Sequence, residues 1–301
     1  MIQVAPEVQS ALDDERPVVA LESTVLAHGL PRPRNLEVGL ALEAEVRAGG
    51  AVPATVGVLG GVPKVGLSAA EVERMATAAG VLKLSTRDLP VAVARGADGA
   101  TTVAATMWLA DAAGLWVFAT GGIGGVHRGG AHDVSADLTE LGRTAMVVVC
   151  AGAKAILDLA ATREALETAG VLVAGWRTDE FPAFYSARSG LPVDVRVDTA
   201  QEAAALWNAQ QELGAPGALL LCVPPPPTHA LDADEVDAAI RRALALAGEQ
   251  GVRGKEVTPF LLRAVAEETG GRSLEANVAL LRNNARVAAE VARAMTAGNR
   301  E

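Results

Sequence analysis

Two of the four lysines in this chain lie in apolar surroundings, where an amine can act as a nucleophile. Lys154 follows the apolar residues 146–150 and a run of small residues, 151–153, that lets a ligand approach the backbone closely. Lys83 lies inside the apolar run at residues 81–84. A lysine kept away from water holds a neutral amine that attacks carbonyl carbon, which an arginine cannot do. The alternative for either residue is a lysine whose charge reaches solvent or pairs with a carboxylate.

A glycine-rich segment follows another apolar run. Residues 120–130 read TGGIGGVHRGG, and glycines there free backbone amides to face an anion such as a phosphate. A dinucleotide-binding loop is disfavoured, because His127 stands where the third glycine belongs and no helical pattern follows at once. The segment therefore indicates a loop around a small phosphate or sugar, with a plain tight turn as the alternative.

Two carboxylates, Asp133 and Asp137, follow this segment, with Ser135 between them. Carboxylates at this spacing, with a hydroxyl between, can hold a hard cation and a substrate hydroxyl. The alternative is structural: Ser135 caps a helix that begins after it, and Asp137 places a negative charge in the first turn of that helix.

Glu22 follows the apolar run at residues 18–21, at the carboxyl end of an expected strand. Ligands of open α/β sheets bind beyond these strand ends, so Glu22 is a candidate proton donor, with a capping role as the alternative. His28, a little further on, either faces the same cleft or fixes a turn. Asn277 and the pair Asn283-Asn284 interrupt the last amphipathic helix; one of them is expected to reach the site, unless all three belong to its polar face.

These residues need a sheet to bring them together, and six short apolar runs predict its strands. Their continuous apolar character fits a sheet that is covered on both faces. The runs are residues 18–21, 81–84, 116–119, 146–150, 171–176 and 218–223.

Helical patterns lie between the apolar runs. Capping boxes predict helix starts at Ser68 and Thr199, Thr258-Pro259 predicts another, and residues 234–249 form a long helix. This alternation predicts an α/β fold: a three-layer α/β/α sandwich with a mixed, mostly parallel central sheet and an α-helical C-terminal portion. We expect a single domain over residues 1–301, with residues 1–17 as an N-terminal extension that can be helical.

The composition disfavours several classes of protein. The net charge is −10 and no long Lys/Arg run is present, which argues against a nucleic-acid-binding surface. No apolar segment reaches the roughly 20 residues of a membrane helix, and residues 1–17 lack the pattern of a signal peptide. Cys150 and Cys222 each end an apolar run and are expected to be buried free thiols. We therefore expect a soluble, cytoplasmic protein.

Eight segments, in order, resemble the pseudouridine-5′-phosphate glycosidase family, which includes indigoidine-pathway proteins and C-glycosynthases of antibiotic pathways. No single segment is decisive, but the ordered set is highly specific. The segments are residues 20–31 (ALESTVLAHGLP), 84–90 (LSTRDLP), 99–107 (GATTVAATM), 119–129 (ATGGIGGVHRG), 133–138 (DVSADL), 151–158 (AGAKAILD), 178–186 (TDEFPAFYS) and 273–284 (SLEANVALLRNN).

The resemblance implies reversible cleavage of the C–C bond between ribose C1′ and uracil C5 of pseudouridine 5′-phosphate, giving uracil and ribose 5-phosphate. It implies that the ribose ring opens and that Lys154 forms an imine with C1′, while Glu22 donates and accepts the proton. Contacts with the substrate are implied for Lys83, Val103, Ser135, Ala136, Asp137, His127 and Asn277, the last two lining the sugar and base.

The resemblance also implies a divalent ion, typically Mn²⁺, at Asp133, and a homotrimer that acts on a small molecule. One departure concerns this metal site. The segment between His127 and Asp133 is shorter than is usual in the family, which can move the ion or change how the loop closes. His132, next to Asp133, is an additional candidate ligand.

Two other functions compete with this one. A C-glycosynthase that joins ribose 5-phosphate to a different aromatic acceptor would use the same catalytic residues with another base pocket. A sugar-phosphate-binding module without catalysis would bind ligand equally well without Lys154. A sugar kinase is disfavoured because the sequence has no P-loop.

Overall fold

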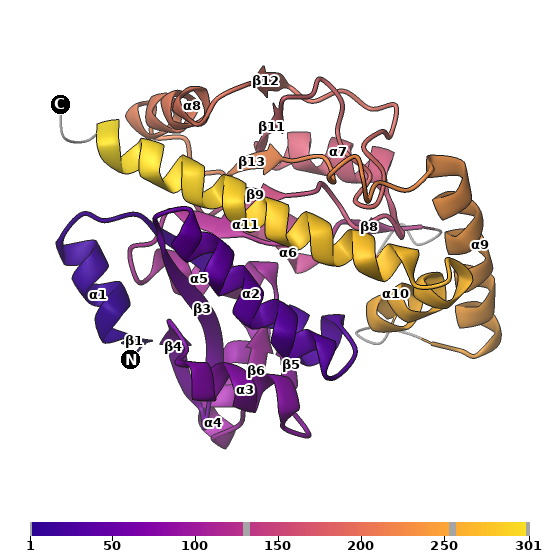
Figure 1. The fold of residues 1–301 in the computed structure, drawn as a ribbon, viewed down its shortest axis with the longest axis horizontal. Coiled ribbons are helices and arrows are strands. Elements are labelled where there is room, and N and C mark those ends of the chain that lie inside the picture. The colour runs from indigo at the N-terminus through magenta and orange to yellow at the C-terminus, as the bar shows by residue number, and fades with distance from the viewer. Residues whose placement is uncertain (1, 129–132, 253–256, 299–301) are drawn as a thin grey trace.

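The computed structural model describes residues 2–128, 133–252 and 257–298 (Figure 1). The strands are β1 (Gln3–Val4), β2 (Val18–Leu21), β3 (Val52–Leu59), β4 (Val62–Val65), β5 (Leu82–Leu84), β6 (Gly99–Thr101), β7 (Val117–Ala119), β8 (Val126–His127), β9 (Val147–Cys150), β10 (Leu157–Asp158), β11 (Leu172–Trp176), β12 (Val195–Val197) and β13 (Leu219–Cys222). The α-helices are α1 (Pro6–Asp13), α2 (Arg34–Ala48), α3 (Ala69–Thr77), α4 (Leu89–Arg95), α5 (Val103–Asp111), α6 (Ala136–Leu141), α7 (Leu159–Thr168), α8 (Ala200–Glu212), α9 (Ala233–Glu249), α10 (Val257–Glu268) and α11 (Arg272–Gly298). A π-helical turn, η1 (Val25–Gly29), and a 3₁₀ turn, η2 (Thr86–Asp88), complete the set.

Eleven of these strands form one mixed sheet, in the order β1-β4-β3-β2-β7-β9-β13-β11-β12, with β6 on β3 and β5 on β6. The strands from β3 to β12 along this order run parallel, whereas β4 and β6 are antiparallel to β3. All six apolar runs predicted as strands are strands of this sheet. β8 and β10 form a separate antiparallel pair.

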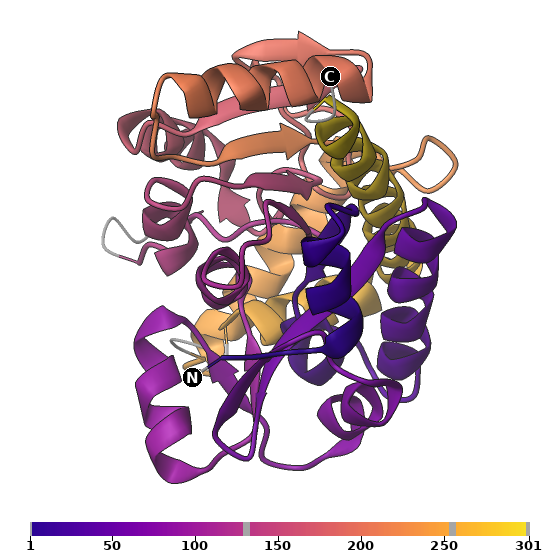
Figure 2. The ribbon, with the colours of Figure 1, turned by 90° about the vertical axis from the view of Figure 1, so that its left-hand side faces the viewer.

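Helices cover both faces of the sheet (Figures 1 and 2). The long helix α11 crosses one face between α2 and α8, and α5, α6 and α7 lie on the other face. The strands between them are buried on both sides, as in β9, where no residue is exposed. The predicted three-layer α/β/α sandwich with a mixed, mostly parallel sheet and a helical C-terminal portion is therefore confirmed.

The N-terminal segment is partly helical, as expected, but it is packed into the fold. Val8 and Ala11 of α1 are buried, and β1 pairs with β4. The capping box at Ser68 is confirmed. At Thr199 the hydroxyl accepts from the Glu202 amide, but the Glu202 carboxylate binds the amide of residue 198 instead of closing the box.

The helix predicted to begin at Thr258-Pro259 is α10, with Pro259 in its first turn, but Thr258 lies inside the helix and is not its N-cap. Cys150 and Cys222 are buried free thiols, as predicted, in register on the neighbouring strands β9 and β13. Among the described residues, every helix is too short or too polar to cross a membrane.

Candidate active site

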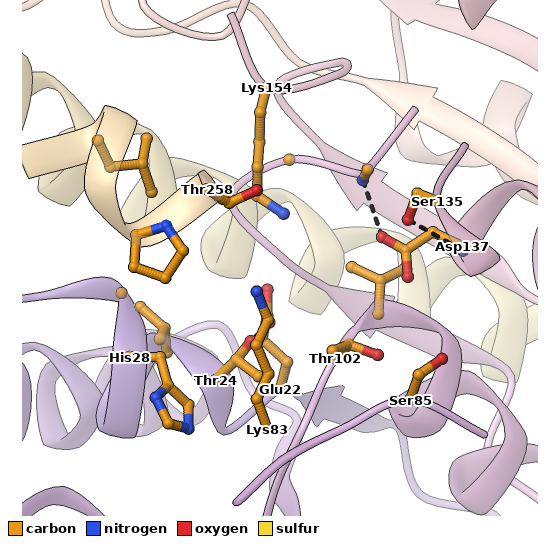
Figure 3. Close-up of a pocket in the computed structure, with 18 of the residues that line it drawn as sticks. Glu22, Thr24, His28, Lys83, Ser85, Thr102, Ser135, Asp137, Lys154 and Thr258 are labelled. Carbon is orange, nitrogen blue, oxygen red and sulfur yellow. Dashed lines mark hydrogen bonds between the residues drawn. The ribbon is translucent and has the colours of Figure 1, made fainter. Parts of the chain in front are cut away.

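A cavity of about 340 Å³ opens beyond the carboxyl ends of β2, β6, β7 and β9 (Figure 3). This is the edge at which open α/β sheets bind ligands. Nine of the ten residues expected at the site line the cavity. They are Glu22, Lys83, Val103, His127, Ser135, Ala136, Asp137, Lys154 and Asn277.

Lys154 lies in the connection between β9 and β10, and its backbone is held on both sides. Its amide donates to the Ile123 carbonyl at 3.1 Å, and its carbonyl accepts from the Leu157 amide at 3.0 Å. The preceding Gly152 has φ +79°, and a Cβ there would lie 2.2 Å from the Pro182 carbonyl oxygen, so only glycine fits. The side chain of Lys154 extends from this fixed loop into the cavity (Figure 3).

Glu22 follows β2 and lies across the cavity from Lys154, on the same side as Lys83 (Figure 3). Two hydroxyls donate to its carboxylate: Thr24 to Oε2 and Thr120, which follows β7, to Oε1. These bonds fix the direction in which the carboxyl group points. An amine and an oriented carboxyl group therefore face one another across the space where a ligand would lie.

Ser135 is the N-cap of α6, and its hydroxyl accepts from the Asp137 amide at 3.2 Å. The Asp137 side chain is buried and accepts two backbone amides, from Gly124 at 2.8 Å and from Ala104 at 3.0 Å. It thereby ties the glycine-rich segment to the first turn of α5. The structural alternative for Ser135 as a cap is confirmed, and Asp137 does more than place a charge in the first turn.

The first turn of α5 begins at Val103, after the N-cap Thr102, and both residues line the cavity. The positive end of this helix therefore faces the cavity. Lys83 of β5 and Ser85 line the same cavity. A cavity lined by backbone amides, hydroxyls and a lysine suits the binding of a phosphate or another small anion.

His127 reaches the cavity from β8, and its amide donates to the Asp133 carbonyl at 2.9 Å. The Asp133 side chain is exposed and is the one expected site residue outside the cavity lining, although its neighbour Val134 belongs to it. His132 lies outside the described residues. Within those residues, no group of three or more His, Cys, Asp or Glu side chains could enclose a metal ion.

Comparison with known proteins identifies the family. The model of the indigoidine synthase A-like family matches residues 7–294, almost the whole chain. The chain belongs to this family. The resemblance seen in the sequence is thereby confirmed.

Relatives within the indigoidine synthase A-like family match over nearly full length. The pseudouridine-5′-phosphate glycosidase of Chloroflexus aurantiacus is 62% identical, covering 97% of this chain and 98% of the relative. That of Herpetosiphon aurantiacus is 60% identical, covering 97% of each chain. Among solved structures, the prealnumycin C-glycosynthase AlnA in complex with ribulose 5-phosphate is 43% identical, with a TM-score of 0.92, and covers 100% of this chain and 98% of its own.

This member of the indigoidine synthase A-like family has further cavity residues that sequence patterns did not reveal. Thr258, Pro259 and Leu262 of α10 form a wall that also includes Val25 and His28 of η1. His28 borders the cleft, and its ring points away from Lys154 and Glu22 (Figure 3). The Thr258-Pro259 pair predicts only a helix start, and nothing in the local sequence connects that helix with the strand ends.

The three asparagines of α11 have different positions. Asn277 lines the cavity. Asn284 is fully buried, and its amide nitrogen donates to the Thr120 carbonyl at 2.8 Å, which supports the start of the glycine-rich segment. Asn283 lies at the side of the helix, where its side chain accepts from Arg286. The expectation that one asparagine reaches the site is met by Asn277.

Proposed function

We propose that this protein is a pseudouridine-5′-phosphate glycosidase, which reversibly converts pseudouridine 5′-phosphate and water into uracil and ribose 5-phosphate. Relatives of that name match it over almost its whole length at 60% and 62% identity. The observation that carries the proposal is the Lys154 side chain facing the Glu22 carboxylate across one cavity (Figure 3). A binding module without catalysis has no need of this pair.

Lys154 is the covalent nucleophile of the proposed reaction. The scissile bond joins two carbons, so protonation of a leaving oxygen, which paired-carboxylate glycosidases use, does not suffice. In the cleavage direction the ring oxygen takes a proton from the Glu22 carboxyl group and leaves C1′ as the 4′-hydroxyl, while the Lys154 amine bonds to C1′ and gives a proton back to the Glu22 carboxylate. Protonation of uracil C5 lets the C1′–C5 bond break, and the nitrogen lone pair forms the imine. Water hydrolyses the imine, which releases ribose 5-phosphate and the free amine.

Glu22 supplies the proton that uracil C5 receives during cleavage. A general acid must lie within reach of the reacting atoms and must point toward them. The hydroxyls of Thr24 and Thr120 hold the carboxyl group in one orientation, opposite the amine that carries the sugar. The same carboxylate accepts the C5 proton in the direction of synthesis.

The remaining cavity residues bind the substrate. We assign the phosphate to the end of the cavity formed by Lys83, Val103 and the backbone of Ser135 and Ala136. His127 and Asn277 line the sugar and base. Asp137 contributes through the two amides that it holds in place.

Asp133 would hold the divalent ion, typically Mn²⁺, that the family resemblance implies. Its donor set fits a weakly enclosed ion: one exposed carboxylate, next to the cavity-lining Val134. Hard divalent ions that keep several waters need only one or two carboxylates together with substrate oxygens. When bound there, the ion would supply positive charge to substrate oxygens at the rim of the cavity.

Incubation with ribose 5-phosphate, uracil and Mn²⁺ tests this proposal. We expect pseudouridine 5′-phosphate to form, detected by chromatography and mass, and we expect the Lys154→Met variant to form none. The wild type forming no product with uracil would contradict the proposal.

A C-glycosynthase acting on another aromatic acceptor is the second candidate, and the match to AlnA favours it. That enzyme would share the lysine and the carboxylate and would differ in the wall formed by α10 and η1. Competition between uracil and a panel of electron-rich aromatic acceptors separates the two functions. A preferred acceptor other than uracil would establish the glycosynthase.

We also propose that the enzyme is a homotrimer, as the family resemblance implies. Trp108 and Trp116 are each 49% exposed, and large aromatic side chains are enriched where subunits meet. Light scattering coupled to size-exclusion chromatography measures the assembly directly. A mass equal to that of one chain would contradict the trimer.

A further inference from the structure

Arg128 follows His127, which lines the cavity. The Arg128 side chain does not point into the cavity lining but contacts residues 154–157, which we call the lysine loop. β8 and β10 pair antiparallel with His127 opposite Leu157, which places Arg128 beside residues 155–157. Its Nε donates to the Leu157 carbonyl at 3.1 Å and its Nη2 to the Ala155 carbonyl at 3.1 Å. One guanidinium thus binds the backbone directly after Lys154.

These two carbonyl groups belong to buried residues. The strand there is the short β10, which pairs with β8 over two residues. Ala155 and Leu157 are 4% and 2% exposed, so their carbonyl groups need partners within the protein. The planar guanidinium presents donors in a fixed geometry and can serve two acceptors at once, which a lysine ammonium cannot do in the same fixed arrangement. Arg128 therefore bonds two carbonyl groups of the backbone that directly follows Lys154.

The third guanidinium nitrogen ties the loop to another part of the molecule. Nη1 of Arg128 lies 2.7 Å from Oδ1 of Asp237 on α9. Helix α9 packs on α10, whose residues Thr258 and Leu262 form part of the cavity wall. The lysine loop is therefore connected through Arg128 to the helix pair that borders the cavity.

We propose that Arg128 is the positioning residue for Lys154, anchored on α9 by Asp237. This inference rests on the proposed function, because it assumes that the Lys154 amine attacks C1′. The side chains of Arg128 and Asp237 are 30% and 38% exposed, and the charge attraction of such an ion pair is modest. The two carbonyl contacts therefore dominate the effect, and the ion pair directs the guanidinium toward them.

The test measures how fast the imine forms, apart from how well the sugar phosphate binds. Borohydride reduction at timed intervals with saturating ribose 5-phosphate gives the rate, and its dependence on ribose 5-phosphate concentration gives the apparent affinity. We expect Arg128→Ala to lower the rate about 100-fold, the effect of misplacing a reacting group by about 1 Å, with little change in affinity. Arg128→Lys should lower the rate less, and Asp237→Asn less again.

Arg241 provides a matched control. It pairs with the other oxygen of Asp237, one turn along α9, and within the described part of the chain it makes no hydrogen bond to residues 154–157. Arg241→Ala should therefore form the imine at the wild-type rate. Thermal melting shows whether each variant is folded.

A folded Arg128→Ala variant that forms the imine at the wild-type rate would overturn the inference. If that variant does not fold, Arg128→Lys decides, and a wild-type rate there would overturn it as well. A loss of affinity in proportion to the loss of rate would place Arg128 in binding instead of positioning. Absence of any adduct at Lys154 in the wild type would overturn the proposed function itself.

Discussion

Replacing Asp137 by asparagine should separate its structural role from direct contact with the substrate. The buried carboxylate accepts the amides of Gly124 and Ala104 at 2.8 and 3.0 Å, one at each oxygen. Asparagine has nearly the same shape but only one acceptor oxygen. Its NH₂ group would face one of the two backbone N–H groups, so that one bond is lost and a buried donor is left unsatisfied.

The size of the effect follows from these two bonds. A hydrogen bond to a charged group contributes about 1.5–3 kcal/mol, and an unsatisfied buried donor costs about 1–3 kcal/mol. We therefore expect Asp137→Asn to lower the free energy of unfolding by about 3 kcal/mol. A loss of 1 kcal/mol lowers the melting temperature by roughly 2–4 °C in chains of about 150–250 residues and by less in longer ones, so the melting temperature should fall by about 6 °C.

Differential scanning fluorimetry and urea unfolding measure this change. Asp133→Asn in metal-free buffer is the matched control, because that carboxylate is exposed and should contribute little to stability. The apparent affinity for ribose 5-phosphate should also weaken in Asp137→Asn, since the glycine-rich segment and the start of α5 are no longer tied. Equal melting temperatures for the wild type and Asp137→Asn would show that the two amide bonds to Asp137 do not stabilise the fold.

Three further substitutions test other contacts. Thr120→Val removes a hydroxyl that orients Glu22 and should lower kcat about tenfold, with KM unchanged, in steady-state assays. Glu43 accepts a hydrogen bond from the Thr55 hydroxyl at 2.5 Å, and burial raises the pKa of its carboxyl group. Above the ordinary pKa of a glutamate, the ionised Glu43 therefore destabilises the folded state. Glu43→Gln should therefore raise the free energy of unfolding at pH 7, and this gain should disappear at a pH below the ordinary pKa of a glutamate. Equal gains at both pH values would contradict this expectation. Asp133→Asn should raise the Mn²⁺ concentration for half-maximal activity about tenfold or more, and an unchanged requirement would remove Asp133 from the metal site.

Six of the eleven strands in the main sheet were predictable, because a sheet covered on both faces requires uninterrupted apolar runs. β3 is the instructive omission: all eight of its residues are buried, but Pro53 and Gly57 interrupt the pattern. Residues 52–55 of β3 pair with β2, whereas β4 and β6 pair with residues 56–59. Pro53 therefore has a ladder partner on one side only, where a missing N–H is tolerated.

The cavity was predictable only where its residues follow strands. Glu22 and Lys154 stand directly beyond apolar runs, and the rule for open sheets brings such ends together. The contact of Arg128 with Asp237 and that of Asp137 with Ala104 join segments far apart in the chain. No local spacing encodes them, so their roles required the structure. The same holds for the wall that α10 contributes.

Reductive trapping with borohydride shows whether Lys154 forms an imine with ribose 5-phosphate. The wild-type protein is incubated with ribose 5-phosphate and sodium borohydride, and the intact mass and the modified peptide are determined. We predict a stoichiometric adduct of reduced ribose 5-phosphate on Lys154, and none in the Lys154→Met variant. No adduct, or an adduct on Lys83 instead, would show that Lys154 is not the nucleophile.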